Sequence, residues 1–325
     1  MTADHRVDRS YYYDPVHKAA VARMQHSFTA RSEWPTYVLA ITIYAGWFGA
    51  LTLLHAGLIS QWSATPILVV LLVWYMSLQH ELLHGHPTRC LWFNKLLGFA
   101  PLAMWYPYTL YRDTHLAHHR DAHLTMPGLD PESNYVSQAE WQSMGRLMRC
   151  VWHVRKTFVG RLVVAPPMAI AMLAIQTMGD WRKGRWHYLP MWVTHIALVA
   201  GMLEGIAQYS HLSVWHYVFA VSWPALAVAM VRSFYEHRAA PEGKSRITIN
   251  DAGLVMRLLY LNNNYHLVHH ALPRVAWYQL PTAYRLRQIQ YRQQAGDFWV
   301  AGGYSALLRQ YAFRPTDDPI HPDTR

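Results

Sequence analysis

The chain has 325 residues, of which 52% are hydrophobic, only 15% are charged and 14% are aromatic, and its formal net charge is +10. This composition, with apolar runs of about 20 residues, is typical of an integral membrane protein. The basic residues are scattered over the loops between these runs and around the C-terminal region, which favours contact with anionic lipid on a cytoplasmic face and argues against nucleic-acid binding.

The first segment, up to Arg31, is polar, mixed in charge and rich in His and Tyr. It has neither a short apolar core nor a cleavage site, so we do not expect a signal peptide. Further along the chain, four hydrophobic runs are long enough to cross a bilayer. We expect two helical hairpins from these four spans: Tyr37–Ile59, Ala64–Leu83, Leu189–Gln208 and Leu212–Val231.

Two shorter apolar stretches lie between the second and the third span. Leu91–Trp105 is interrupted by Pro101, and Leu162–Ile175 contains the pair Pro166 and Pro167. Their length favours segments that dip into the membrane without crossing it. A fifth crossing at Leu162–Ile175 would also place the histidine clusters described next on opposite sides of the membrane.

Three histidine clusters occur in the strings HELLH, HLAHH and HLVHH, and together they contain His80, His84, His115, His118, His119, His266, His269 and His270. Residues spaced by three and four positions project from one face of a helix, so these side chains can converge on one pocket. One metal rarely takes more than six ligands and a structural zinc takes four, so the number of imidazoles predicts two ions sharing a site. Imidazole suits iron, copper, nickel and zinc alike, and the ligands alone do not choose among them.

Two other interpretations compete with a two-metal site. HELLH fits the HExxH pattern of zinc proteases, in which the histidines bind zinc and the glutamate, here Glu81, is the general base. This interpretation gives no function to the histidines of HLAHH and HLVHH. A metal transporter or storage protein would place its ligands inside the spans, whereas these clusters lie at or beyond the span ends.

With these strings the chain resembles the membrane fatty acid desaturase and hydroxylase superfamily, whose hallmark is three histidine boxes. The strings HHRDAHLTMPGLDPES and NNNYHLVHHALPRVAWYQLP are similar to those of bacterial fatty acid desaturase-like proteins. The resemblance covers roughly residues 35–290. It implies an all-α integral membrane fold with about four transmembrane helices in two hairpins and a cytoplasmic helical cap that carries the boxes.

The resemblance also implies two iron ions held by histidine. His237, in RSFYEHR after the fourth span, is the candidate for a further histidine that the family carries before its third box; the alternative is a loop histidine paired with Glu236. Asn263 is a candidate to hold a metal-bound water or to hydrogen-bond a ligand imidazole, and the alternative is a turn residue. The expected ligands are His80, His84, His115, His118, His119, His237, His266, His269 and His270. Several carboxylates near the second cluster are candidates to orient imidazoles or to form ordinary surface salt bridges: Asp113, Asp121, Asp130 and Glu132.

The function that the resemblance implies is O2-dependent desaturation of an acyl lipid or acyl thioester by hydrogen abstraction. The boxes do not distinguish a desaturase from a hydroxylase or ketolase of a lipid, a carotenoid or a small amino-acid-like substrate, as in the dihydrorhizobitoxine-type desaturases. Cys90 and Cys150 form no CxxC pair, which excludes a disulfide framework, a zinc ribbon and a rubredoxin-like centre. Electrons are therefore expected from a separate ferredoxin or cytochrome b5-like carrier.

The expected organisation is a cytoplasmic N-terminal segment over residues 1–34, a membrane desaturase domain over 35–290 and a cytoplasmic C-terminal tail over 291–325. We expect the active site on the cytoplasmic side of a bacterial inner membrane.

Overall fold

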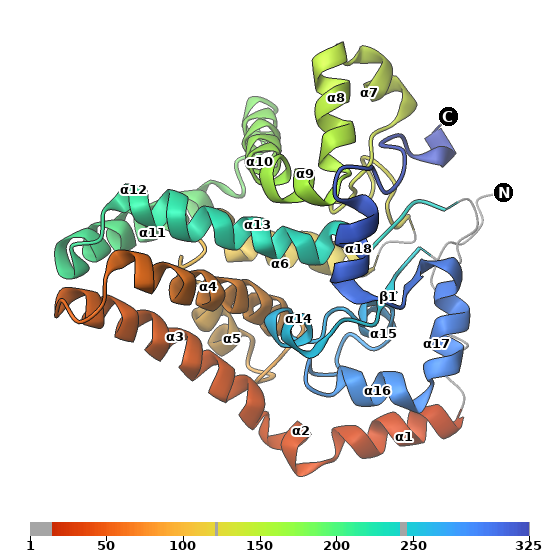
Figure 1. Cartoon of the computed structure of the whole chain (residues 1–325), viewed down its shortest axis with the longest axis horizontal. Coiled ribbons are helices and arrows are strands. Elements are labelled where there is room, and N and C mark those ends of the chain that lie inside the picture. Colours follow the sequence, from red (N-terminus) through yellow and green to blue (C-terminus); the bar gives the residue numbers. More distant parts are fainter. Residues whose placement is uncertain (1–14, 121–122, 241–245, 325) are drawn as a thin grey trace. The chain divides into compact units, whose positions relative to one another are not determined.

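The computed structural model describes residues 15–120, 123–240 and 246–324, and it is mostly helical, with 68% helix and 3% strand (Figure 1). The chain divides into two units. Unit 1 consists of the described residues of 1–34, 113–161 and 231–325, and unit 2 consists of 35–112 and 162–230. The expectation of no signal peptide concerns a segment whose first 14 residues lie outside the described ranges.

Unit 2 holds the apolar helices. Its elements are α3 (Trp34–His55), α4 (Gln61–Leu83), α5 (Leu91–Gly98), α10 (Ala165–Arg182), α11 (Leu189–Ser210), α12 (Val214–His216) and the π-helix η2 (Tyr217–Ser222). The division between the units falls just after Trp34, the first residue of α3, and inside α6 (Tyr108–His118), α9 (Phe158–Val163) and α13 (Trp223–Arg232).

Among the described residues, four helical stretches are long and apolar enough to cross a membrane: Trp34–His55, Gln61–Leu83, Leu189–Ser210 and Val214–Tyr235. The prediction of four spans is confirmed. The first span ends at His55, earlier than expected, because Gly57 adopts a left-handed φ of 68° that terminates the helix. On α11 the side chains of Val193 and Ile196 are about three-fifths exposed, as suits a surface that faces lipid.

The fourth span is not a uniform α-helix. Pro224 has no N–H to donate, and the preceding Trp223 N–H bonds to the carbonyl of Val218, five residues back, which gives the π-helical segment η2. Tyr217 at the start of η2 is fully buried. Its hydroxyl donates to the Leu102 carbonyl at 2.9 Å and accepts from the Trp47 indole N–H at 3.1 Å. One hydroxyl therefore connects three segments of unit 2.

The two shorter apolar stretches form helices that are not among the four candidate spans. Helix α5 ends at Gly98, before Pro101. Helix α10 begins at Ala165 but continues to Arg182, beyond the expected end at Ile175. That these segments dip into the membrane stays a prediction.

Unit 1 contains short helices and one small parallel sheet. Its remaining elements are α1 (Pro15–Gln25), α2 (Phe28–Ser32), α7 (Gln138–Ser143), α8 (Arg146–Arg155), the 3₁₀ turn η3 (Ser233–Tyr235), β1 (Ile249–Asn250), α14 (Leu254–Leu259), α15 (His266–Ala271), α16 (Leu280–Leu286), α17 (Gln288–Ala295), η4 (Gly296–Phe298), β2 (Trp299–Val300), α18 (Gly303–Tyr311) and η5 (Pro322–Thr324). Strand β1 pairs with β2 in the register Ile249 with Trp299.

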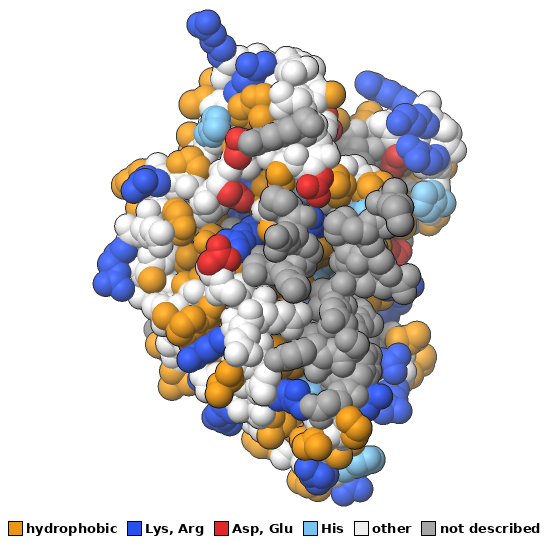
Figure 2. All heavy atoms as spheres, turned by 90° about the vertical axis from the view of Figure 1, so that its right-hand side faces the viewer, with side chains coloured by type: hydrophobic (Ala, Val, Ile, Leu, Met, Phe, Trp, Pro, Cys, Tyr) orange, Lys and Arg blue, Asp and Glu red, His pale blue; other side chains and the backbone are white. Residues whose placement is uncertain are grey.

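The apolar core of unit 1 surrounds α15, which carries the third histidine cluster. Val268 on the buried side of α15 packs in one cluster with Ile249 of β1, Leu280 of α16 and Tyr291 of α17. Burial of these side chains fixes the short helix, which has too few residues to be stable alone. On the face drawn in Figure 2, the Lys and Arg side chains of the described residues are dispersed.

Candidate metal centre

The second histidine cluster lies at the C-terminal end of α6. His115 and His118 occupy its last turn and are buried, and His119 follows directly. The N–H of His119 donates to the carbonyl of His115 at 3.0 Å, so the helical spacing continues past the end of the helix. Three imidazoles thus project from adjacent positions of one short surface.

The third cluster is held by the asparagines that precede it. Asn262 has a left-handed φ of 57°, which asparagine tolerates better than most residues. The side chain of Asn264 donates to the carbonyl of Asn250 in β1 at 2.6 Å. The N–H of Leu267 donates to the carbonyl of Thr248 at 3.0 Å. These bonds anchor the start of α15 to the sheet and fix where His266, the first residue of that helix, begins.

His237 reaches the same region through a short antiparallel bridge with Ile247. The N–H of Arg238 donates to the carbonyl of Arg246 at 3.1 Å, and the N–H of Thr248 donates to the carbonyl of Glu236 at 3.0 Å. Thr248 also accepts from the backbone of α15, so His237 and the third cluster are connected by one continuous stretch of backbone bonds.

Four of the predicted site residues, His118, His237, His266 and His270, form one group within unit 1, with ligand atoms no more than 4.8 Å apart. The Nε2 atom of His237 lies 3.0 Å from that of His118 and 2.8 Å from that of His266. The Nε2 atoms of His266 and His270 are 3.1 Å apart. Two nitrogens that each lie about 2.1 Å from one ion, at right angles to each other, are about 3.0 Å apart. The group therefore has the nitrogen spacing of adjacent ligands around a metal.

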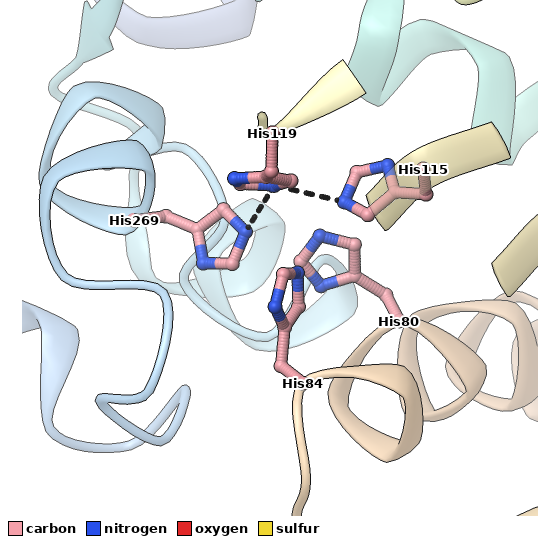
Figure 3. Close-up of side chains that lie close together, drawn as sticks. All are labelled: His80, His84, His115, His119 and His269. Atoms are coloured by element: carbon pink, nitrogen blue, oxygen red, sulfur yellow. Dashed lines mark hydrogen bonds between the residues drawn. The ribbon is translucent and has the colours of Figure 1, made fainter. Parts of the chain in front are cut away.

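Three more predicted site residues, His115, His119 and His269, form a second group in unit 1. The Nε2 atom of His119 lies 3.0 Å from Nε2 of His115 and 3.2 Å from Nε2 of His269 (Figure 3). These distances again match adjacent ligands of one ion. Each histidine of HLAHH and HLVHH is thereby assigned to one of two groups.

The first cluster, His80 and His84, lies in unit 2 at the C-terminal end of α4. His80 is in the last turn of the helix and buried, and His84 is the residue that caps it. Their ring centroids are 4.9 Å apart, so both imidazoles leave the helix on the same side. The buried Glu81 carboxylate lies 3.4 Å from Nδ1 of His80.

Carboxylates face the other ring nitrogen of two histidines of the second cluster. Nδ1 of His118 lies 2.9 Å from Oδ1 of Asp130, and Nδ1 of His115 lies 2.8 Å from Oε1 of Glu132. A carboxylate on Nδ1 fixes the tautomer and orientation of a ring whose Nε2 faces a metal. Both carboxylates contact ligand candidates, and their role in orienting the imidazoles stays a prediction. Asp121 lies outside the described residues, and Asp113 is half-buried on α6.

Asp130 is itself held by the chain around it. Its Oδ2 accepts from the N–H of Thr125 at 2.7 Å, and its Oδ1 accepts from the N–H of Glu132 at 2.9 Å. The hydroxyl of Thr125 lies 3.1 Å from Nε2 of His321, which is completely buried. A residue near the C-terminus therefore supports the carboxylate that contacts His118.

Asn263 occupies the place that the sequence suggested, beside a histidine of the third cluster. Its side-chain amide donates to Oε1 of the buried Glu236 at 2.8 Å, and its Oδ1 lies 3.4 Å from Nδ1 of His266. Arg232 Nε lies 3.4 Å from the same glutamate oxygen. Sequence reasoning considered Glu236 only as a partner of His237 and missed its contact with Asn263. The one available signal was its position directly before His237.

Burial and neighbouring charges set the protonation of these groups. Burial, reinforced by neighbouring histidines, lowers the pKa of His237, His266 and His270 well below the usual range. Burial acts in the same direction on His118, but the carboxylates of Glu132 and Asp130 raise its pKa to about 9. Burial likewise opposes ionisation of Glu132, yet His115 and His118 bring its pKa down overall. Most of the first group is thus neutral imidazole, the form that binds metals.

Comparison with known proteins agrees with this geometry. The family model described as fatty acid desaturase matches residues 56–301, which is most of the chain and includes every predicted ligand. No protein of curated function matches the chain.

Proposed function

The chain belongs to the fatty acid desaturase family, and from this premise we propose that it is an O2-dependent di-iron desaturase that introduces a carbon–carbon double bond into an acyl lipid or acyl thioester. Membership of the family implies an oxidoreductase of the desaturase and hydroxylase type. The observation that carries the proposal is the spacing of about 3 Å between Nε2 atoms within two separate histidine groups.

We assign one metal to His118, His237, His266 and His270. For the other metal, His115, His119 and His269 supply three nitrogens, and His80 and His84 complete the set in the proposal. Every donor is a histidine nitrogen, which fits iron, and both cysteines are exposed and unpaired. Bound iron supplies the chemistry of dioxygen reduction and of hydrogen removal from an unactivated C–H bond.

The chain's own residues prepare this site. Asp130 and Glu132 hold His118 and His115 through Nδ1, which leaves Nε2 directed at the metal. Asn263 lies between His266, which is in the same group as His118, and the carboxylate of Glu236. Asp130 and Glu236 are buried, which keeps water from competing for their contacts, whereas Glu132 is partly exposed.

The overall reaction removes two hydrogens from the substrate, consumes one O2 with two further electrons and two protons, and releases two waters. We propose that a separate ferredoxin or cytochrome b5-like protein supplies the electrons. The four spans support a membrane location, and we propose the cytoplasmic side of a bacterial inner membrane for the active site. A hydroxylase uses the same ligands and differs in how the substrate carbon is positioned.

The first test is metal content of the purified protein, combined with Mössbauer spectroscopy after iron-57 labelling. We expect about two irons per chain as a coupled pair. One zinc without iron would overturn the proposal in favour of the HExxH protease. Lipid profiling of an expressing strain then distinguishes an alkene product from an alcohol.

Variants separate the two classes independently. We expect His115→Ala to abolish substrate oxidation and Glu81→Gln to retain it. A protease would instead lose peptide hydrolysis on Glu81→Gln and keep it on His115→Ala. The matched control is His211→Ala, because His211 is exposed at the end of α11 and lies outside the clusters. Its iron content should equal that of the unmodified protein.

A further inference from the structure

A pocket in unit 1 borders the first histidine group. Its volume is about 390 Å³, within the size range of small-ligand sites. It lies between the segment that carries His237, the end of α8 and the C-terminal residues after α18. Its walls include Asn134, Arg155, Lys156, Arg161, His237 and Asp317.

The walls carry more positive than negative charge. Among the described lining residues, three arginines and one lysine stand against two aspartates. Arg155, Lys156 and Arg161 are each less than a tenth exposed. A buried cation is costly unless an anion or several hydrogen bonds accompany it. The excess of positive charge favours an anionic ligand.

The two aspartates are already engaged with specific cations. Asp317 accepts from the ammonium of Lys156 at 2.9 Å and also from the hydroxyl of Tyr135. Asp297 pairs with Arg238. Both aspartates of the pocket are therefore paired, Asp317 with Lys156 and Asp297 with Arg238.

The other two arginines converge on a neutral oxygen. Arg155 donates to Oδ1 of Asn134 at 2.7 Å, and Arg161 donates to the same atom at 3.1 Å. Arg161 is oriented further by the carbonyl and hydroxyl of Ser233, at 3.1 and 3.2 Å. Two guanidinium groups directed at one oxygen have the arrangement in which arginines hold a carboxylate or a phosphate.

The rest of the pocket lining includes apolar side chains and a histidine of the first group. Phe234, Tyr235 and Tyr311 add apolar surface beside the charged wall. His237 forms part of the wall, and its Nε2 belongs to the first histidine group. A ligand with an anionic head and an apolar body therefore fits, and its head lies beside a residue of the metal centre.

We propose that this pocket binds the anionic head group, a carboxylate or a phosphate, of the substrate, with Arg155 and Arg161 as the residues that recognise it. The inference rests on the proposed function, because it names the substrate class of that site. It excludes substrates whose head group is an uncharged ester or alcohol.

The test uses the full-length, iron-loaded protein in lipid nanodiscs and three water-soluble probes of equal chain length. Hexanoate, hexyl phosphate and hexanol are titrated by calorimetry. Binding of either anion roughly tenfold or more tighter than hexanol, weakening as salt is added, supports the pocket, and the stronger of the two identifies carboxylate or phosphate. Equal affinity for the anions and hexanol, or binding of none of them, overturns it.

Two substitutions locate the binding. Arg155→Gln and Arg161→Gln should each weaken the preferred anion roughly tenfold to a hundredfold, with hexanol affinity unchanged. The control is Arg146→Gln, which removes an exposed arginine from the same helix, α8. Unchanged anion affinity in both pocket variants contradicts the proposal. If one variant does not fold, the comparison of probes on the unmodified protein still decides.

Failure of this inference differs from failure of the proposed function. A protein that holds two irons and oxidises substrate, yet binds the anions and hexanol alike, refutes the pocket alone. A protein without iron that still binds hexanoate through Arg155 and Arg161 refutes the desaturase proposal and retains the pocket.

Discussion

Replacement of Asp130 by asparagine tests whether the carboxylate on His118 prepares the metal site. Three donors converge on the two carboxylate oxygens, namely Nδ1 of His118, the N–H of Thr125 and the N–H of Glu132, at 2.7–2.9 Å. An asparagine offers one oxygen and an NH2 group, so at least one donor must face another donor. Because Asp130 is only 3% exposed, water does not replace the lost acceptor.

We expect Asp130→Asn to change both the folding free energy and the affinity for metal. A buried donor without an acceptor costs about 1–3 kcal/mol of folding free energy. Loss of the negative partner of a ligand histidine lowers metal affinity by roughly tenfold to a hundredfold. We therefore expect a lower unfolding temperature and weaker iron binding, with both irons still bound at saturating concentration because all nine imidazoles remain.

The assay is competition for ferrous iron against a chelator of known affinity, with thermal unfolding measured on the same samples. Asp180→Asn is the control, because Asp180 forms a partly exposed ion pair with Arg185 far along the chain from the ligands. Surface pairs of this kind contribute little. Iron affinity of Asp130→Asn within about threefold of the unmodified protein would refute the orienting role.

Three further outcomes follow from the contacts. Asn263→Ala removes the amide that donates a hydrogen bond to the buried carboxylate of Glu236. It should weaken iron binding roughly tenfold in the same competition assay, whereas unchanged affinity would assign Asn263 a turn role only. Burial lowers the pKa of Lys156 to about 8 against the attraction of a neighbouring aspartate, so its charge is present below that pH and hexanoate binding should weaken from about pH 7 to about pH 9. A flat calorimetric profile would exclude Lys156 from binding. Gly160→Ala places a Cβ 1.7 Å from the carbonyl oxygen of Val154 and should lower the unfolding temperature, with a cost of about 1–3 kcal/mol or more, whereas Gly145→Ala, in open space, should not.

The elements predicted from the sequence are those governed by local pattern. The spans follow from runs of apolar residues, and both HLAHH and HLVHH keep helical spacing in the structure. His237 was placed beside the third cluster by resemblance, and the structure brings it to His118 and His266. Its role as a ligand stays a prediction until metal is measured.

The features that the sequence could not specify depend on contacts between distant residues. Nothing local to Lys156 indicates that Asp317 pairs with it, because 160 residues separate them and many carboxylates could serve. The same holds for Arg161, whose partner Ser233 lies in another segment. The pocket is the sum of such contacts, so it emerges only with the fold.

Likewise, the sequence left open whether Asp130 and Glu132 were surface charges. Their position in the DPES string after the second cluster allowed both interpretations. The turn that starts at Thr125, with a left-handed φ of 75°, directs the two carboxylates back toward α6. This backbone geometry brings both carboxylates to histidines, and residue spacing alone does not indicate it.

The contact between His321 and Thr125 joins segments that the ribosome makes at very different times. The ribosome makes His118, Thr125 and Asp130 before the third and fourth spans, whereas the buried imidazole of His321 is added after all four spans. Until then the first histidine group lacks part of its support, and His266 and His270 are also translated late. We therefore expect full support of this group only after His321 has been translated, which is later than the last of the four candidate spans.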